Sequence, residues 1–356
     1  MGFIGSILVL SFLVFFHELG HFLAAKLFGV RVDAFSIGFG KTKLFKKQIG
    51  ETEYSLRPIP LGGFVSLKGQ SDSDPTLRNT DKDSIYGIAL WKRLVILAAG
   101  SFFNILLAFL LFCAAFGLGR SELAPVVGSV AEGSAAAKSG ILKGDEIIKI
   151  DNKTIKSWDS LSKAVAESSG SLSIEILRNG EIVAKNITPE IGKGKNIFGE
   201  EIKRPLLGIS ASGESSIVSY NFVDSVILGF KETLESSKLI LQSIEKLIFG
   251  VVPLSEIGGV VSIVSITAKA TELGIVVLFT FSALISVNLG ILNLLPIPAL
   301  DGGHIIFTLY EMIFKKAPSE SAMYRLTLLG WGILLALMCL GLYNDILRIL
   351  NGSMPF

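Results

Sequence analysis

Four long apolar runs constrain the fold of this chain more than any other feature. A helix that crosses the hydrocarbon core of a bilayer needs about 20 predominantly apolar residues. The chain has 356 residues, of which 50% are hydrophobic and 18% are charged, and its mean hydropathy of +0.59 is too high for an ordinary soluble enzyme. The apolar runs are Phe3–Leu27, Leu94–Gly119, Leu273–Leu300 and Leu326–Asn344. They predict an α-helical multi-pass membrane protein with four transmembrane helices.

The first run has an alternative interpretation as the apolar core of a signal peptide. It lacks a basic N-terminal region, and no cleavage site of small residues follows it. It also ends in a charged motif, His17-Glu18, which suits a membrane-embedded site better. We therefore count Phe3–Leu27 as a transmembrane helix.

Basic residues in the short loops predict the orientation in the membrane. They are concentrated in the loop Phe28–Lys92 and in the loop after the third run, which contains Lys315, Lys316 and Arg325. Short loops rich in Lys and Arg stay in the cytoplasm, whereas long domains translocate largely regardless of their charge. Both termini and the region 120–270 are then expected outside the cytoplasm.

The region 120–212 differs in character from the apolar runs. Short strands are expected at Val126–Val130, Glu146–Ile150, Leu172–Leu177 and Glu181–Ala184, with a helix at Leu161–Glu167. The segment Ala135–Lys153, with its Gly-Ile-Leu-Lys-Gly-Asp turn and following strand, resembles the body of a bacterial PDZ domain. The resemblance implies a β-rich domain that binds peptide ends by strand addition. A generic small β-rich domain is the alternative.

Two further segments complete the predicted domain organisation. Residues 50–68 alternate between apolar and polar side chains and contain a Pro/Gly bend, which predicts a membrane-edge β-hairpin. The apolar stripe of Phe222–Phe249 predicts a helix that lies on the membrane surface or packs on the membrane core. The predicted domains are 1–119 with the first two spans, 120–212 as the PDZ-like insert, 213–272 as linker helices and 273–356 with the last two spans.

A metal-binding motif lies at the end of the first apolar run. His17 and His21 are four residues apart, so they share one face of a helix and both imidazoles can reach one metal ion. Glu18 is offset by one position and can address a water molecule on that metal. This is the His-Glu-x-x-His pattern of zinc proteases, and the chain holds only 3 histidines in all. A pair of hydrogen-bonded core histidines is the alternative.

A catalytic zinc site needs a third protein ligand in addition to water. Asp301 ends a long uncharged run. An ionisable residue at membrane depth is energetically costly, so it is a functional candidate by default. The prolines and glycines around it break the helix, which is tolerated only where the backbone is buried in protein or lines a wet cavity. We predict Asp301 as the third ligand; His304 competes for this role, and a helix cap is a third interpretation of Asp301.

Taken together, these motifs resemble the site-2 protease family, and most closely its bacterial RseP-type zinc metalloproteases. The residues that carry the resemblance are His17-Glu18-x-x-His21, the Asn293–Gly303 segment, the Gly100-x-x-x-Asn104 pair and the PDZ-like insert. The family has two tandem PDZ domains in many RseP-type members, whereas this chain shows one. Ile257–Val260 also lacks the proline of the corresponding family segment.

The resemblance implies a zinc cofactor held by His17, His21 and Asp301, with Glu18 as the catalytic residue. It also implies that Asn293 contacts the substrate or the oxyanion, for which a structural hydrogen bond is the alternative. Further substrate contacts are expected at Tyr54, Gly62, Gly63, Phe64, Asn104, Pro296 and Pro298.

The expected function is intramembrane proteolysis of single-span membrane proteins, such as anti-sigma factors or signal-peptide remnants, which another protease has already trimmed. The expected location is a bacterial inner membrane, with the PDZ-like domain outside the cytoplasm and with lipid around the spans. The sequence shows no nucleic-acid-binding signature. The alternatives are a non-catalytic PDZ scaffold with a structural metal and a transporter, whose broken helices are similar.

Overall fold

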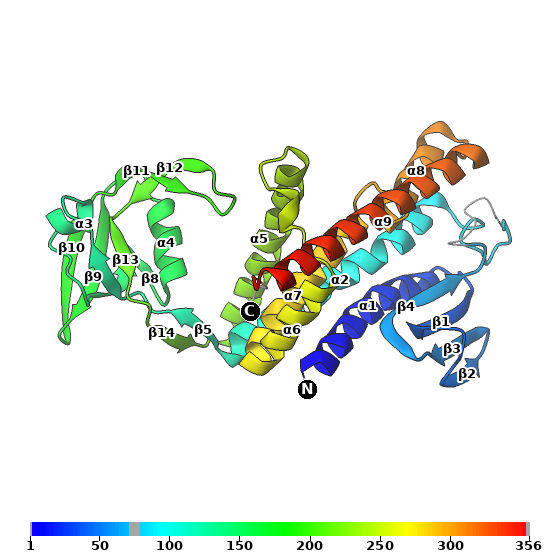
Figure 1. Ribbon diagram of the computed structural model, residues 1–356, viewed down its shortest axis with the longest axis horizontal. Coiled ribbons are helices and arrows are strands. Elements are labelled where there is room, and N and C mark those ends of the chain that lie inside the picture. The colour runs from blue at the N-terminus through cyan, green and yellow to red at the C-terminus, as the bar shows by residue number, and fades with distance from the viewer. Residues whose placement is uncertain (1, 71–78, 354–356) are drawn as a thin grey trace. The chain divides into compact units, whose positions relative to one another are not determined.

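The computed structural model describes residues 2–70 and 79–353, and its ribbon is drawn in Figure 1. The chain divides into two compact units. The first unit combines Met1–Ala115 with Ser225–Phe356, and the second consists of Phe116–Asp224. Of the polar segment 70–84, residues 71–78 lie outside the described part of the chain.

Four helices of the described residues are long and apolar enough to cross a membrane, which confirms the predicted number. They are α1 (Gly2–Leu27), α2 (Leu90–Leu118), α7 (Ile275–Asn293) and α9 (Glu320–Leu350). The third helix is shorter than the apolar run that predicted it. It ends at Asn293 because Pro296 and Pro298 lack a backbone donor and restrict the residues before them. After this break, α8 (Asp301–Phe314) begins at the predicted metal ligand.

Two more helices complete the first unit. The helix α5 (Phe222–Ile248) agrees with the predicted stripe, and it buries small residues such as Gly229 and Thr233 rather than its apolar stripe. After the short 3₁₀ helix η1 (Leu254–Glu256), α6 (Val260–Leu273) packs along α1. The buried Asp345 of α9 caps the start of α6, because it accepts hydrogen bonds from the N–H groups of Gly259 at 3.0 Å and Ser262 at 3.1 Å.

A four-stranded sheet follows α1, in the strand order β2-β3-β1-β4. Its strands are β1 (Val32–Phe39), β2 (Phe45–Ile49), β3 (Thr52–Leu56) and β4 (Ile59–Leu67). The predicted hairpin is therefore wrong: β3 and β4 both exist, but β1 lies between them and pairs with β3 in parallel and with β4 antiparallel. The reason is burial, because β1 carries the most buried residues of the sheet, including Val32 and Phe35, and so takes a central place.

The sheet is fixed to the membrane helices by a small apolar core. This core contains Ala25, Val30, Val32, Leu67, Ile85 and Ile96. It joins the end of α1 to both β1 and β4 and to the start of α2. Because β4 runs beside α1, the strand lies next to the face of α1 that carries the metal motif.

The second unit is rich in strands, several of which agree with the predicted segments. A sheet with the order β10-β9-β7-β8 contains β7 (Glu146–Ile150), β8 (Lys153–Thr154), β9 (Leu172–Arg178) and β10 (Glu181–Ile187). Three two-stranded ladders pair β5 (Arg120–Leu123) with β14 (Ser215–Val218), β6 (Val127–Val130) with β13 (Ile209–Ala211), and β11 (Glu190–Lys195) with β12 (Glu201–Leu206). The helices are α3 (Ala135–Lys138) and α4 (Trp158–Ala166). One apolar core, centred on Ile147, Ile174 and Ile176, holds this unit together.

Candidate metal centre and active site

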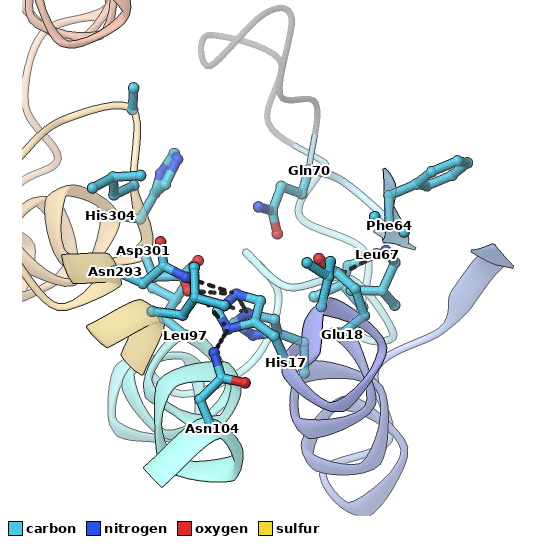
Figure 2. Close-up of a pocket in the computed structure, with 18 of the residues that line it drawn as sticks. His17, Glu18, Phe64, Leu67, Gln70, Leu97, Asn104, Asn293, Asp301 and His304 are labelled. Atoms are coloured by element: carbon cyan, nitrogen blue, oxygen red, sulfur yellow. Dashed lines mark hydrogen bonds and ion pairs between the residues drawn. The ribbon is translucent and has the colours of Figure 1, made fainter. Parts of the chain in front are cut away.

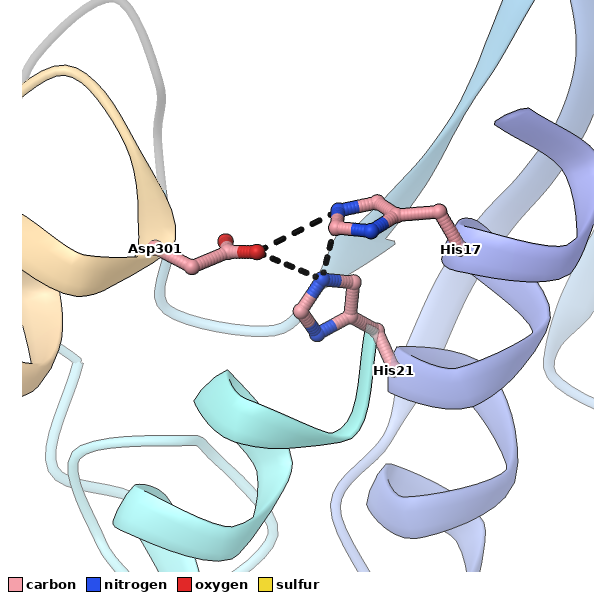
Figure 3. A group of neighbouring side chains, drawn as sticks. All are labelled: His17, His21 and Asp301. Atoms are coloured by element: carbon pink, nitrogen blue, oxygen red, sulfur yellow. Dashed lines mark hydrogen bonds and ion pairs between the residues drawn. The ribbon is translucent and has the colours of Figure 1, made fainter. Parts of the chain in front are cut away.

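The metal motif places two imidazoles side by side on α1. The Nε2 atoms of His17 and His21 lie 3.2 Å apart. The third side chain comes from the start of α8, since Asp301 Oδ2 lies 3.2 Å from each of these nitrogens. Figure 3 shows the three side chains converging on one point. Residues separated by about 280 positions in the chain thus meet only because α8 begins beside α1.

The donor set and its spacing fit zinc. Zinc in proteins is bound tetrahedrally by imidazole nitrogen and carboxylate oxygen at about 2.0–2.2 Å, so neighbouring donors are about 3.3 Å apart. The three donor atoms of this site form a triangle with sides of 3.2 Å. In addition, Asp301 Oδ2 is buried and has no hydrogen-bond partner in the described part of the chain. A buried carboxylate oxygen without a donor is costly unless a cation neutralises it.

The orientation of His21 is fixed by the second span. Its Nδ1 lies 2.8 Å from the carbonyl oxygen of Ile96 on α2. A carbonyl can only accept, so Nδ1 carries the proton and donates it. The Nε2 atom of His21 is then unprotonated and presents its lone pair to the metal position. Such an outer partner is typical of imidazoles that bind zinc.

Gly100 on α2 makes room for both imidazoles. A Cβ atom at this position would lie 2.3 Å from His21 Nε2 and 2.7 Å from His17 Cε1. Real Cβ atoms do not approach other atoms this closely, so every other residue would displace the metal ligands. The sequence marks Gly100 only through its spacing from Asn104; the steric reason becomes visible in the structure.

Glu18 lies on the side of α1 that faces the sheet. Its Oε2 accepts a hydrogen bond of 2.9 Å from the backbone N–H of Val65 on β4. Figure 2 shows Glu18 beside this strand, with Asp301 across the pocket. Glu18 is absent from the metal-capable group, which consists of His17, His21 and Asp301 among the described residues.

These side chains line one cavity of about 490 Å³. Five of the predicted substrate contacts and oxyanion candidates also line it: Gly62, Gly63, Phe64, Asn104 and Asn293. Tyr54, Pro296 and Pro298 are outside its lining. Tyr54 instead packs its ring against those of Phe22 and Phe35, at 6.0 and 6.2 Å between centroids. The two prolines lie in the turn between α7 and α8, directly before Asp301.

Several cavity residues were not predicted as substrate contacts from the sequence. His304, Gln70, Thr327 and Trp331 line the cavity together with the metal ligands. Their positions depend on how α8, α9 and the end of the sheet pack around α1, and no local pattern marks them. His304 was weighed as a metal ligand, and it lies in the cavity but outside the group of three ligands.

Comparison with known proteins agrees with this site. The model of peptidase family M50 matches residues 5–337. A protein of Campylobacter jejuni is 45% identical over 349 residues, which cover 98% of this chain and 94% of that protein. A protein of Helicobacter pylori strain J99 is 39% identical over 354 residues, with coverage of 98% and 100%. Both relatives carry the name "Putative zinc metalloprotease". The chain belongs to peptidase family M50, the site-2 protease family, and its cofactor is zinc.

Proposed function

We propose that this protein is an intramembrane zinc endopeptidase that cleaves the transmembrane segments of single-span membrane proteins. The observation that carries the proposal is the shared cavity. The metal ligands, Glu18 and one strand of the sheet all line it, and the ligands belong to helices that are long and apolar enough to cross a membrane or begin directly after one. A protease whose site lies among such helices acts on substrates that also enter the membrane.

The residues of this chain divide the chemistry between them. Zinc, when bound, supplies polarisation of the scissile carbonyl and activation of the attacking water. The Glu18 carboxylate accepts the proton of that water as general base and returns it to the nitrogen of the leaving amine. His17, His21 and Asp301 would hold the zinc ion at the wall of the cavity.

In the proposed mechanism, Asn293 stabilises the developing oxyanion. Its amide nitrogen lies 3.4 Å from Nδ1 and 3.5 Å from Nε2 of His17, and its side chain lines the cavity beside the metal ligands. A carboxamide N–H directed at an oxyanion in a water-poor site lowers the barrier substantially. Asn293 is the last residue of α7, directly before the break that leads to Asp301.

In the proposed mechanism, strand β4 holds the substrate in an extended form. It is the last strand of the order β2-β3-β1-β4, so one of its edges has no partner strand among the described residues. A helical substrate segment must unwind before its peptide bond is accessible, and an edge strand captures extended chain through backbone hydrogen bonds. Glycine at position 63 allows β4 to lie close to β1, because a Cβ atom there would lie 2.7 Å from the carbonyl oxygen of Ser36.

The unit Phe116–Asp224 is proposed as a PDZ-like domain outside the cytoplasm that restricts access to the membrane site. It contains a groove of about 250 Å³ between α4 and residues 204–209, lined by apolar side chains such as Leu161, Val165 and Leu207. Such a groove beside the short strand β13 suits an extended peptide end. We propose an inner-membrane location in bacteria, and substrates that another protease has already trimmed.

A reporter assay tests the proposed activity. Purified protein in detergent is given a single-span membrane segment, and cleavage and zinc content are measured for wild type and Glu18→Gln. We expect cleavage to fall at least about 100-fold with zinc unchanged, because general-base catalysis contributes roughly 10²–10⁴-fold and Glu18 is not a ligand. Glu51→Gln, on an exposed residue of the sheet turn, is the matched control and should cleave normally. Equal cleavage by Glu18→Gln would contradict the role of Glu18 as general base, and a zinc-loaded wild type that does not cleave would favour the non-catalytic PDZ scaffold.

Reporter fusions test the proposed orientation. A reporter active only in the cytoplasm should work when it is inserted between residues 70 and 84, and it should fail near Gly170, because the basic short loops stay inside. Activity at both positions would contradict the external location of the second unit.

Deletion of residues 121–210 with a short flexible linker tests whether the second unit acts as a filter that restricts substrate access. The variant should cleave a trimmed substrate and also some of a substrate with a folded ectodomain. Loss of both activities with zinc retained would contradict the filter.

A further inference from the structure

Asn104, which was predicted as a substrate contact, stands directly next to the metal site. It lies on α2, one turn after Gly100, and it is 0% exposed. Its amide nitrogen lies 3.3 Å from Nδ1 of His17, on the side of the ring away from Asp301. Figure 2 shows the side chain below the His17 ring, joined to it by a dashed line. We propose that Asn104 is a positioning residue, whose amide oxygen accepts the Nδ1–H of His17 and thereby directs Nε2 of His17 to the metal.

The protonation state of a metal-binding imidazole leads to this assignment. A neutral imidazole carries one N–H and one lone pair, and the nitrogen that binds metal must be the one without a proton. In His17 it is Nε2 that lies 3.2 Å from Asp301 and from His21 Nε2. Its Nδ1 therefore carries the proton and needs an acceptor. An amide nitrogen cannot serve, since it is itself a donor.

The carboxamide of Asn104 offers that acceptor. Its two ends are nearly equal in size, and the hydrogen-bond network decides which end faces a neighbour. Asn104 Oδ1 is buried and has no hydrogen-bond partner in the described part of the chain. A half-turn of the carboxamide brings this oxygen to the Nδ1–H of His17, so that one rotation removes a donor–donor contact and satisfies a buried acceptor. A buried acceptor without a partner is unfavourable, because it has lost its hydrogen bonds to water.

The helix α2 also supplies a hydrogen-bond acceptor for the second imidazole, that of His21. The carbonyl oxygen of Ile96 accepts from Nδ1 of His21 at 2.8 Å. In this arrangement α2 supplies both outer acceptors, one from its backbone and one from a side chain. Asn104 is also held firmly in place, because its own carbonyl oxygen accepts a 2.7 Å hydrogen bond from Ser286 on α7.

Asn293 is less suited to the same task. Its amide nitrogen is almost equally far from both ring nitrogens of His17, at 3.4 and 3.5 Å. An atom at nearly equal distance from Nδ1 and Nε2 is directed at neither nitrogen in particular. Asn104, in contrast, contacts Nδ1 alone. The two asparagines thus have separate roles, Asn104 toward the ligand and Asn293 toward the substrate.

Zinc affinity of three full-length variants tests the inference. Affinity is measured by competition with a chromogenic chelator, on folded protein checked by thermal melting. Asn104→Leu keeps the size and removes the acceptor, and it should bind zinc about 10–100-fold more weakly, the usual effect of losing an outer partner. Asn104→Asp keeps an acceptor and should remain near wild type. Asn293→Leu is the control on the other asparagine and should also bind zinc normally.

A second measurement needs no variant. With ¹⁵N-labelled histidine the protein contains only 3 labelled side chains, and the zinc-loaded form should show a solvent-protected Nδ1–H for both His17 and His21. The inference is overturned if only His21 shows this proton, if Asn104→Leu binds zinc like wild type, or if Asn104→Asp loses as much affinity as Asn104→Leu. The inference rests on the zinc site itself, and the two fail differently: a wild type without zinc defeats the site, whereas equal zinc in all variants defeats only the role of Asn104.

Discussion

Glu18 and Val65 are joined by a hydrogen bond of 2.9 Å, which ties the residue next to the metal ligand His17 to strand β4. Val65 is opposite Phe35 in the ladder with β1, and β4 is the last strand of its sheet. The Val65 N–H group that donates to Glu18 is thus one to which a strand added to β4 could also form a hydrogen bond. The proposed general base and the proposed substrate edge share one backbone group.

Removal of this backbone donor should impair cleavage without loss of metal. Val65→Pro eliminates the N–H, and proline is tolerated on an edge strand when its nitrogen faces away from the ladder. We expect cleavage to fall at least about 10-fold with zinc content unchanged, because Glu18 loses its anchor and a general base contributes roughly 10²–10⁴-fold when it is well placed. Val65→Ala, which keeps the N–H, is the control. Equal cleavage by both variants would show that the hydrogen bond has no role.

A methyl group at Gly100 should disturb the metal site directly. The Cβ atom of Gly100→Ala would lie 2.3 Å from His21 Nε2, so the imidazoles must move and zinc occupancy should fall. Gly332→Ala on α9 is a matched change in a membrane helix, where nothing lies within 4 Å of the new atom. It should leave zinc unchanged and raise helix stability slightly. Metal analysis of the purified variants is the measurement; normal zinc in Gly100→Ala would refute the steric argument.

The third ligand is tested by comparing Asp301 with His304. Asp301→Ala removes one of three donors and should lower both zinc occupancy and cleavage strongly. His304→Ala removes a cavity residue outside the ligand group and should keep most of its zinc. Zinc is quantified in protein purified under identical conditions. The reverse pattern, with zinc lost only in His304→Ala, would make His304 the ligand.

The cap that α9 provides for α6 should be important for stability. Asp345 is 0% exposed and accepts from the N–H groups of Gly259 and Ser262. Asp345→Ala leaves the buried N–H of Ser262 and the half-buried N–H of Gly259 without this acceptor, which should cost about 3 kcal/mol. Glu256→Ala is the nearby control, since its 66% exposed side chain forms only a 3.9 Å pair with Arg348 and should contribute little. Unfolding in mixed micelles of SDS and mild detergent measures both variants; similar stabilities would contradict the cap.

The second unit should lose stability in acid through Asp145. Burial favours the neutral acid, but two hydrogen bonds of 2.7 Å from Arg178 and one from the N–H of Leu142 outweigh it and lower the pKa of Asp145. A lowered folded-state pKa stabilises the fold above the unfolded pKa of about 3.9, and this contribution disappears as the pH falls further.

The ion pair can be tested in the full chain. Arg178→Ala should lower the free energy of unfolding near neutral pH, because the buried carboxylate of Asp145 loses its partner, and it should weaken the pH dependence of unfolding below pH 4. Trp158 fluorescence reports on this unit once Trp91 and Trp331 are replaced by Phe. Lys153→Ala, in a pair with Glu167 that is about 70% exposed on both sides, is the control. An unchanged acid transition in Arg178→Ala would contradict the assignment.

The sequence by itself determined the parts of this protein that depend on local patterns. Apolar runs of membrane length predicted four spans, and four suitable helices are present. The spacing of His17 and His21 on one helix needs no tertiary information, because a helical turn brings them together. The break before Asp301 likewise follows from Pro296 and Pro298, which cannot continue a helix. Each of these predictions rests on residues within a few turns of one another.

The tertiary structure alone decided what depends on contacts between distant segments. The pairing of β1 with β3 and β4, and hence the error of the hairpin, results from competition for a buried central place, which alternation within one strand does not encode. The requirement for glycine at Gly100 and the donor from Val65 to Glu18 arise where helices and a strand approach within van der Waals distance. Such contacts depend on the packing of whole elements, and that packing is a property of the complete fold and its long-range burial.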